Sequence, residues 1–332
     1  VFIVAGLNAF LNSKRTRHFS WILCIFIILI YSLRRNVGTD WPGYEFYFNN
    51  ITSNTVIEQY NFEYGYWLLN FIFNIFFGSY GVLVSAVGIF NGILFWKASK
   101  KYSSNIGIIM LLSLYYLFFP TLEAFRQSIT LFLFYFSIQF LQSNRNKYFI
   151  LNILGLLFHS TGVFTLFFYF FYRYKIIKVL IVLSLLFFSL LEPYINEALK
   201  FFPMLHVKYE WYFHGAPVDN SIFNLKYLEY AILLIYYFIL YRKQVINQYE
   251  TLCFNLVSLG FIFQITLGQI SEIIYRMAYY SDVGVLFTYA FIYDRIRSRS
   301  LKFIYIIFLI IYLFLRLYRA FPTDNPSLFY SF

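Results

Sequence analysis

The sequence predicts an all-α fold, a polytopic helical bundle in a membrane with about ten to twelve membrane-embedded segments. Hydrophobic residues make up 61% of the 332-residue chain and charged residues only 12%. A soluble globule averages about 25% charged residues, so this chain has too few for a water-facing surface. Long apolar runs recur from end to end, and they lack the alternation that is typical of a membrane β-barrel.

Most predicted helices follow directly from apolar runs that reach, or nearly reach, the length needed to cross a bilayer. In chain order, these runs lie at about residues 19–33, 80–96, 105–119, 125–141, 176–191, 222–241, 252–268, 277–293 and 303–318.

Two further apolar segments are ambiguous. Residues 66–77 would form only about 18 Å of helix, which is short of a roughly 30 Å hydrocarbon core. We therefore expect this segment to be re-entrant or interfacial. Residues 148–172 allow one long helix or two half-helices broken at residues 159–162.

The distribution of positive charge decides how these two segments are placed relative to the membrane. With 66–77 re-entrant and 148–172 broken, one side of the membrane receives most of the basic residues and only two acids, Glu250 and Asp294. The basic residues are Lys14, Arg15, Arg17, Lys97, Lys100, Lys101, Arg145, Lys147, Arg173, Lys175, Lys178, Arg242, Lys243, Arg295, Arg297, Arg299 and Lys302. We assign this side to the cytoplasm. Residues 1–332 are then expected to form one transmembrane domain with outer loops at about 34–65 and 192–221.

The densest polar sequence in the chain follows the first apolar run, at residues 34–44. It carries Arg34, Arg35, Asp40 and Tyr44 among turn-forming glycine and proline residues. An arginine pair at the outer end of a helix opposes the positive-inside trend. The alternative explanation is that these arginines snorkel to lipid headgroups.

Two charged residues lie beside apolar segments on the same predicted side. Glu63 opens the short segment at 66–77, where its carboxylate could bind a substrate or simply cap a helix. Arg126 lies one turn into an apolar run, and an ionisable residue at that depth suggests a functional role. The alternative for Arg126 is a structural ion pair with Glu123.

His159 and Arg276 complete the set of candidates. His159 lies in apolar sequence before Ser-Thr-Gly, and a hydrogen-bonded core histidine explains it equally well. Arg276 follows Glu272 by four residues, so an ion pair along one helix is its alternative.

Sequence motifs for nucleotide, dinucleotide or metal chemistry are absent. We therefore expect no cofactor and no metal. The net charge of +11 is explained by cytoplasmic loops, so we expect no nucleic acid partner. Arginines among aromatic side chains suit another ligand, because guanidinium groups bind phosphate oxygens bidentately and aromatic faces pack on sugar rings.

In its ordered motifs the sequence resembles the EpsG-type, Wzy-like polysaccharide polymerases. The resemblance lies in Arg-Asn-Val-Gly-Thr-Asp-Trp at 35–41, Glu-Tyr-Gly-Tyr at 63–66, Phe-Arg-Gln-Ser-Ile at 125–129 and Leu-Phe-His-Ser-Thr-Gly at 157–162. A late Tyr-Arg, ending at Arg276, completes the order. The resemblance covers nearly the whole chain from about residue 20.

The resemblance implies an enzyme of the bacterial inner membrane that joins oligosaccharide units of O-antigen, capsule or exopolysaccharide. Each unit is carried on undecaprenyl pyrophosphate, and transfer takes place on the periplasmic or outer face. It also implies a fold similar to that of the GT-C membrane glycosyltransferases. Chain-length regulators and flippases are the partners that it implies.

That chemistry assigns a role to each candidate residue. Arg35, Arg126 and Arg276 would contact the diphosphate, with Arg34 and Tyr44 also at the substrate. Asp40 would be the base, with Glu63 and His159 as rivals. Three alternatives stay open: a lipid-linked glycan ligase, a flippase or transporter without chemistry, and a purely structural subunit.

Overall fold

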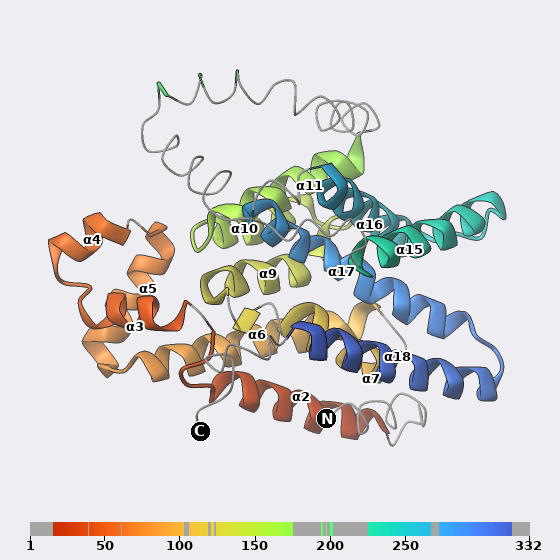
Figure 1. Cartoon of the computed structure of the whole chain (residues 1–332), viewed down its shortest axis with the longest axis horizontal. Helices are drawn as coiled ribbons and strands as arrows, with labels where there is room; N and C mark the ends of the chain where they lie inside the picture. Colours follow the sequence, from red (N-terminus) through yellow and green to blue (C-terminus); the bar gives the residue numbers. More distant parts are fainter. Residues whose placement is uncertain are drawn as a thin grey trace. The chain divides into compact units, whose positions relative to one another are not determined.

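In the computed structural model the described residues contain only helical elements (Figure 1). The described residues are 16–38, 40–60, 62–102, 106–118, 121–122, 124–174, 194, 197, 200–201, 225–266 and 272–320. For this part of the chain the predicted all-α class is confirmed. The predicted span at 176–191 and nearly all of the predicted outer loop at 192–221 lie outside the described residues.

The chain divides into two compact units, Val1–Val163 with Tyr289–Phe332, and Phe164–Thr288. The second unit contains α11 (Val163–Arg173) beyond its first residue, α15 (Leu225–Arg242), α16 (Gln248–Thr266) and most of α17 (Glu272–Arg295). The first unit contains the remaining elements: α2 (Thr16–Ser32), α3 (Trp41–Asn49), α4 (Asn54–Tyr60), α5 (Tyr64–Phe77), α6 (Tyr80–Tyr102), α7 (Ile106–Ser113), η1 (Leu114–Phe118), α9 (Phe125–Ser137), η2 (Ile138–Phe140), α10 (Arg145–Leu156), η3 (Ser160–Gly162) and α18 (Arg299–Ala320).

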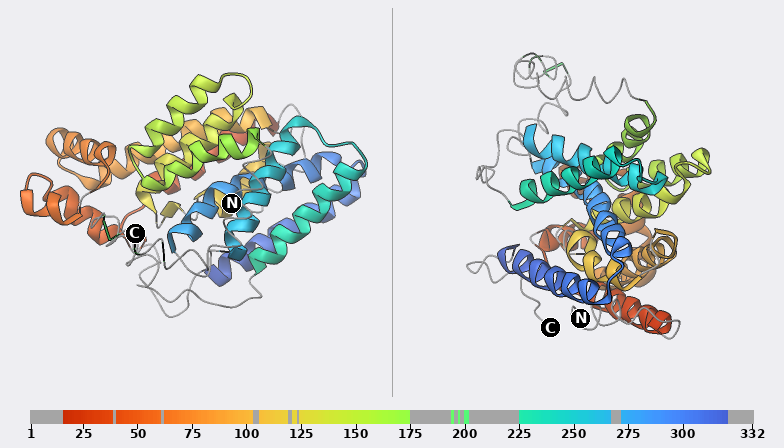
Figure 2. Two further views of the ribbon diagram at one scale, coloured as in Figure 1. Left: turned by 90° about the horizontal axis from the view of Figure 1, so that it is seen from above. Right: turned by 90° about the vertical axis from the view of Figure 1, so that its right-hand side faces the viewer.

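Small residues allow α2 and α6 to pack closely in the first unit, and Figure 2 shows the helices around them. A Cβ added at Gly88 would lie 2.3 Å from the Ser32 hydroxyl oxygen, and one at Gly92 would lie 2.2 Å from the Ile28 side chain. Glycines four residues apart let two helix backbones approach in this way. Helix α6 also packs against α9, which in turn packs against α10.

The segment predicted as an outer loop at 34–65 is partly helical, and its place outside the membrane stays a prediction. It contains α3 and α4. Pro42 lies at the start of α3, where its fixed backbone angle favours a helix and its missing N–H costs nothing. The helix then buries Tyr44, Tyr47 and Phe48. These short helices give the polar motif a packed support.

The two ambiguous segments have the lengths that the charge pattern favours. Helix α5 has 14 residues and stops at Gly78, whose backbone is left-handed. That is about 21 Å of helix, so its re-entrant placement stays a prediction. Residues 148–172 are broken as predicted, because α10 ends at Leu156 and α11 begins at Val163.

Among the described residues, two helices are long and apolar enough to cross a membrane, Tyr80–Lys101 and Arg299–Tyr318. The total number of spans stays a prediction, as does the topology. We expect cysteine labelling from outside the cell to reach positions near 45 and 210, but not positions near 100, 145, 243 and 297. Labelling of 45 and 100 from the same side would contradict the charge-based orientation.

Candidate functional site

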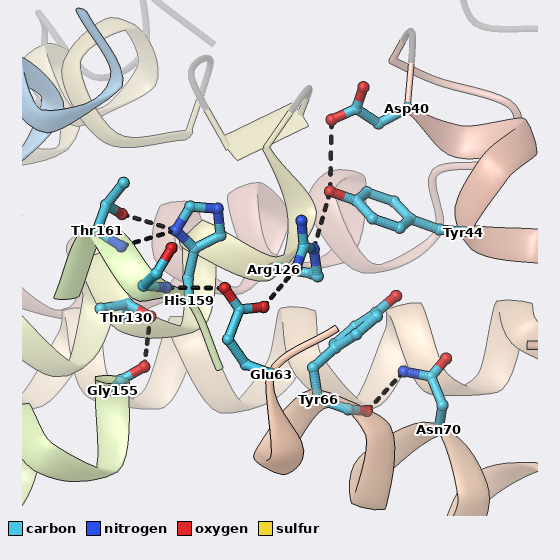
Figure 3. Close-up of polar contacts among 11 residues, drawn as sticks. Asp40, Tyr44, Glu63, Tyr66, Asn70, Arg126, Thr130, Gly155, His159 and Thr161 are labelled. Carbon is cyan, nitrogen blue, oxygen red and sulfur yellow. Dashed lines mark hydrogen bonds and ion pairs between the residues drawn. The ribbon is translucent and has the colours of Figure 1, made fainter. Parts of the chain in front are cut away.

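Arg126 is the centre of a polar cluster in the first unit (Figure 3). It lies in the first turn of α9, where the helix dipole disfavours a positive charge. The Glu63 carboxylate compensates, because its Oε2 forms an ion pair with Arg126 Nη1. The two side chains are 14% and 20% exposed, so the pair is open to a ligand at one edge. Within the described residues, Nη2 has no hydrogen-bond partner.

Aromatic rings surround the Arg126 guanidinium. Its Cζ atom lies 4.1 Å from the Phe62 ring centroid, 5.6 Å from that of Tyr44 and 5.7 Å from that of Tyr66. Ring faces attract a cation and also lower its exposure to water. The arginine is therefore held in a fixed orientation, as a phosphate-binding fork requires.

Tyr44 connects Arg126 to Asp40. The Tyr44 hydroxyl accepts a hydrogen bond from Arg126 Nε at 3.3 Å and donates to Asp40 Oδ2 at 3.4 Å. Asp40 is the residue before α3, and its side chain forms no capping hydrogen bond with that helix. The structure thus brings three predicted site residues together: Asp40, Tyr44 and Arg126.

Glu63 links this group to the break between α10 and α11. It precedes α5, yet its side chain does not cap that helix. Instead, Glu63 Oε1 accepts the backbone N–H of Ser160 at 2.9 Å. Helix capping therefore does not explain Glu63. Glu123, the alternative partner of Arg126, lies outside the described residues.

His159 is buried and shapes the turn that supplies this N–H group. Its Nδ1 accepts the Thr161 backbone N–H at 3.2 Å and lies 2.7 Å from the Thr161 hydroxyl oxygen. Because the backbone group can only donate, this network assigns the ring hydrogen to Nε2. The hydrogen-bonded core histidine expected as the alternative is thus present, next to the site.

The two adjacent arginines have different surroundings. Arg34 is 1% exposed, donates from Nη1 to the Thr121 carbonyl at 2.9 Å and lies 4.4 Å from the Tyr31 ring centroid. Arg35 is exposed, and its guanidinium lies where a Cβ at Gly81 would meet it at 2.7 Å.

Tyr80, which precedes Gly81, shows that Arg35 lies in the same region as Asp40 and Arg126. The Tyr80 ring packs against Trp41 with centroids 4.9 Å apart and against Phe125 at 6.0 Å. Trp41 and Phe125 directly adjoin Asp40 and Arg126 in sequence. Arg276 is half-buried on α17 in the second unit, and the side chain of Glu272 lies outside the described residues.

Sequence reasoning did not find several groups in this cluster. Phe62 and Tyr66 contact Arg126 through their rings, and their neighbours in the sequence gave no sign that they face it. The Ser160 contribution is a backbone N–H group, which no residue type reveals. Within the described residues, no group of three His, Cys, Asp or Glu side chains could hold a metal ion.

The charge state of Glu63 follows from its contacts. Burial alone would raise its pKa, but the Arg126 guanidinium and the backbone N–H groups of Glu63 and Ser160 lower the pKa below the ordinary value of 4.5. Glu63 is thus an anion at neutral pH and a weak proton acceptor.

This lowered pKa makes a prediction about stability. A carboxylate with a depressed pKa stabilises the fold fully above its unfolded pKa and loses that contribution as the pH falls through the folded value. The difference in thermal midpoint between the protein and Glu63→Gln should stay constant from pH 8 to about 5.5 and shrink below about 4.5. A difference that already shrinks between pH 7 and 6 would assign the titration to another group, such as His159.

Gly65 explains how α5 comes close enough for Glu63 to reach Ser160. Its N–H donates to the Leu157 carbonyl oxygen at 2.8 Å, and a Cβ at this position would lie 2.7 Å from that oxygen. Because the obstacle is backbone, it cannot swing away. We expect Gly65→Ala to cost about 1–3 kcal/mol of stability, measured by thermal unfolding in detergent.

Gly43→Ala is the matched control for this substitution. No heavy atom lies within 4 Å of a Cβ at Gly43, which is on α3. Alanine favours helix over glycine, so Gly43→Ala should be neutral or slightly stabilising. Equal thermal midpoints for the two variants would show that α5 and Leu157 are not in close contact.

In the described part of the chain, the fold and the cluster define a class of protein: one of apolar helices with an arginine and a carboxylate paired among aromatic rings. The sequence model of the EpsG family matches residues 18–331. The chain belongs to the EpsG family, as the sequence motifs indicated. Membership and the apolar helices together indicate a membrane protein, and membership supports a polysaccharide polymerase type of role. Searches of curated proteins and of solved structures give no match.

Proposed function

We propose that this protein joins oligosaccharide repeat units into surface polysaccharide, with each unit carried on undecaprenyl pyrophosphate. Transfer takes place on the outer face of the bacterial inner membrane. The observation that carries this proposal is the fixed orientation of Arg126, held by Glu63 and Tyr44 with Asp40 on the far side of Tyr44. A guanidinium beside a carboxylate matches the two needs of glycosyl transfer from a diphosphate.

The first need is to stabilise the leaving group. When the anomeric C–O bond breaks, the electron pair and negative charge pass to the diphosphate oxygen. Groups that are already oriented toward that charge lower the barrier without reorganisation. Arg126 contributes its Nη2 edge, and the exposed Arg35 would add a second cation. We assign both to the diphosphate.

The second need is a base for the acceptor hydroxyl, whose oxygen forms the new glycosidic bond and whose proton must leave. Glu63 suits this poorly, because Arg126 and Ser160 occupy both carboxylate oxygens and its pKa is lowered. His159 directs Nδ1 to Thr161. Asp40 is half-buried and accepts a long contact from Tyr44, so we assign the proton to Asp40.

Positioning is the proposed role of the other residues. Glu63 orients Arg126, and His159 shapes the turn that holds Glu63. Arg34 is buried against Thr121 and Tyr31, so we propose that it fixes the loop before Arg35 rather than contacting substrate. Arg276 stays a candidate for the diphosphate. Chain-length regulators and flippases are the proposed partners.

A cellular experiment separates this proposal from its alternatives. In the bacterium that carries the gene, deletion should abolish long polysaccharide while single repeat units accumulate on the lipid carrier at the outer face. Loss of a ligase would instead leave finished polymer on the carrier. Loss of a flippase would leave single units on the inner face. Either of those patterns would refute the polymerase assignment.

A further inference from the structure

An apolar groove of about 610 Å³ lies between α15 and α16 in the second unit. Leu234, Phe238 and Tyr241 of α15 form one wall, and Phe254, Ser258 and Ile262 of α16 form the other. Phe238 is 61% exposed and Tyr241 is 70% exposed. A groove of this size between two helices can accept a ligand.

Among the side chains that line the groove, the hydroxyl groups of Ser258 and Tyr237 are engaged inside the unit, and the third hydroxyl group belongs to the exposed Tyr241. The Ser258 hydroxyl donates to the Phe254 carbonyl at 2.7 Å. The Tyr237 hydroxyl lies 2.7 Å from the Thr288 hydroxyl oxygen, inside the unit. A sugar or another polar ligand would find few groups here to replace its hydrogen bonds to water. The groove therefore suits a hydrocarbon chain.

Positive charge lies at one end of this groove. The guanidinium carbon of Arg242 lies 5.8 Å from the ring centroid of Phe238, which lines the groove. Lys243 follows it, and both side chains are exposed. The acid nearest in sequence, Glu250, is buried and accepts the Asn247 N–H at 2.9 Å. The Arg242 guanidinium thus borders an apolar groove, with Lys243 next to it in the sequence, and this pairing complements an anionic headgroup on a hydrocarbon chain.

We infer that this groove binds an anionic glycerophospholipid, with an acyl chain between α15 and α16 and the phosphate at Arg242 and Lys243. Basic residues beside helices on the cytoplasmic side bind acidic headgroups in this way. The charge pattern of the sequence predicts that side for Arg242. The site is independent of the proposed polymerase activity and would tie the second unit to acidic membrane.

Native mass spectrometry of the purified full chain tests this inference. The protein would be titrated with phosphatidylglycerol or phosphatidylcholine of identical acyl chains. We expect one phosphatidylglycerol to be retained in clear preference. The double variant Arg242→Gln/Lys243→Gln should weaken its binding about tenfold or more, since each cation contributes about fivefold. Phosphatidylcholine binding should hardly change.

Arg145→Gln/Lys147→Gln is the matched control. It removes the same two charges from another predicted cytoplasmic loop, and Lys147 likewise lies over a ring, 4.1 Å from the centroid of Phe140. It should leave the preference intact, whereas Ser258→Trp, which fills the groove, should remove the retained lipid. The inference would be overturned if the control variant lost phosphatidylglycerol binding equally, or if the unchanged protein showed no headgroup preference. It would also be overturned if undecaprenyl phosphate displaced phosphatidylglycerol at a lower concentration than phosphatidylglycerol itself needs to bind.

Discussion

Replacing Arg126 with lysine is expected to reduce chain extension about a hundredfold or more, the usual cost of losing an oriented donor to developing charge. Lysine keeps the positive charge and can still pair with Glu63. It loses the Nε–H group that donates to Tyr44 and the planar fork that binds a phosphate bidentately. The measurement is the rate of product formation from a lipid-diphosphate-linked repeat unit.

The thermal midpoint of Arg126→Lys should stay close to that of the unchanged protein, because the ion pair survives. Arg145→Lys is the control, since Arg145 is exposed at the start of α10, and it should extend chains normally. Full activity of Arg126→Lys would assign the Arg126–Glu63 pair to structure alone.

Asp40→Asn is expected to have the second large effect, a loss of about 10²–10⁴ in rate, the range for a general base. Asparagine is nearly isosteric, and its amide oxygen can still accept from Tyr44. It cannot take a proton from the acceptor hydroxyl. Single repeat units should therefore accumulate while binding of the lipid-linked substrate persists, measured by titration of the purified variant.

Glu45→Gln, on the helix that Asp40 precedes, provides the matched control. Its Oε2 accepts the Trp41 Nε1–H at 3.1 Å, and the glutamine oxygen can keep that bond. Activity should be preserved. If Asp40→Asn also loses binding, Asp40 orders the loop or contacts sugar, and His159 becomes the better base. Normal polymerisation by Asp40→Asn would remove Asp40 from the chemistry.

The parts of the fold that could be predicted from sequence are those that a single property decides. Long apolar runs located α6, α15 and α18, and the Ser-Thr-Gly after His159 located the break before α11. Helices α3 and α4 were not predicted from sequence, because each is short and gains its stability from burying residues such as Tyr47 and Phe48 against other elements. No local pattern records that burial.

The candidate site also has residues that the sequence could predict and residues that it could not. Arg126 stood out because a charge in apolar sequence has to be compensated. Its partner could not be chosen, since Glu123 is three residues away and Glu63 is 63 residues away. The close approach of Gly65 to Leu157 helps to bring Glu63 to the site, and no local sequence pattern indicates that approach. Arg34 and Arg35 look alike in sequence, and burial alone distinguishes them.

The central claim is tested most directly by incubating the purified protein with a synthetic undecaprenyl-pyrophosphate-linked repeat unit and separating the products by size. The account predicts a ladder in which each step adds one repeat unit, formed by the unchanged protein and by Arg145→Lys but not by Asp40→Asn. Unchanged substrate with the unmodified protein, under conditions in which binding is demonstrated, would contradict it.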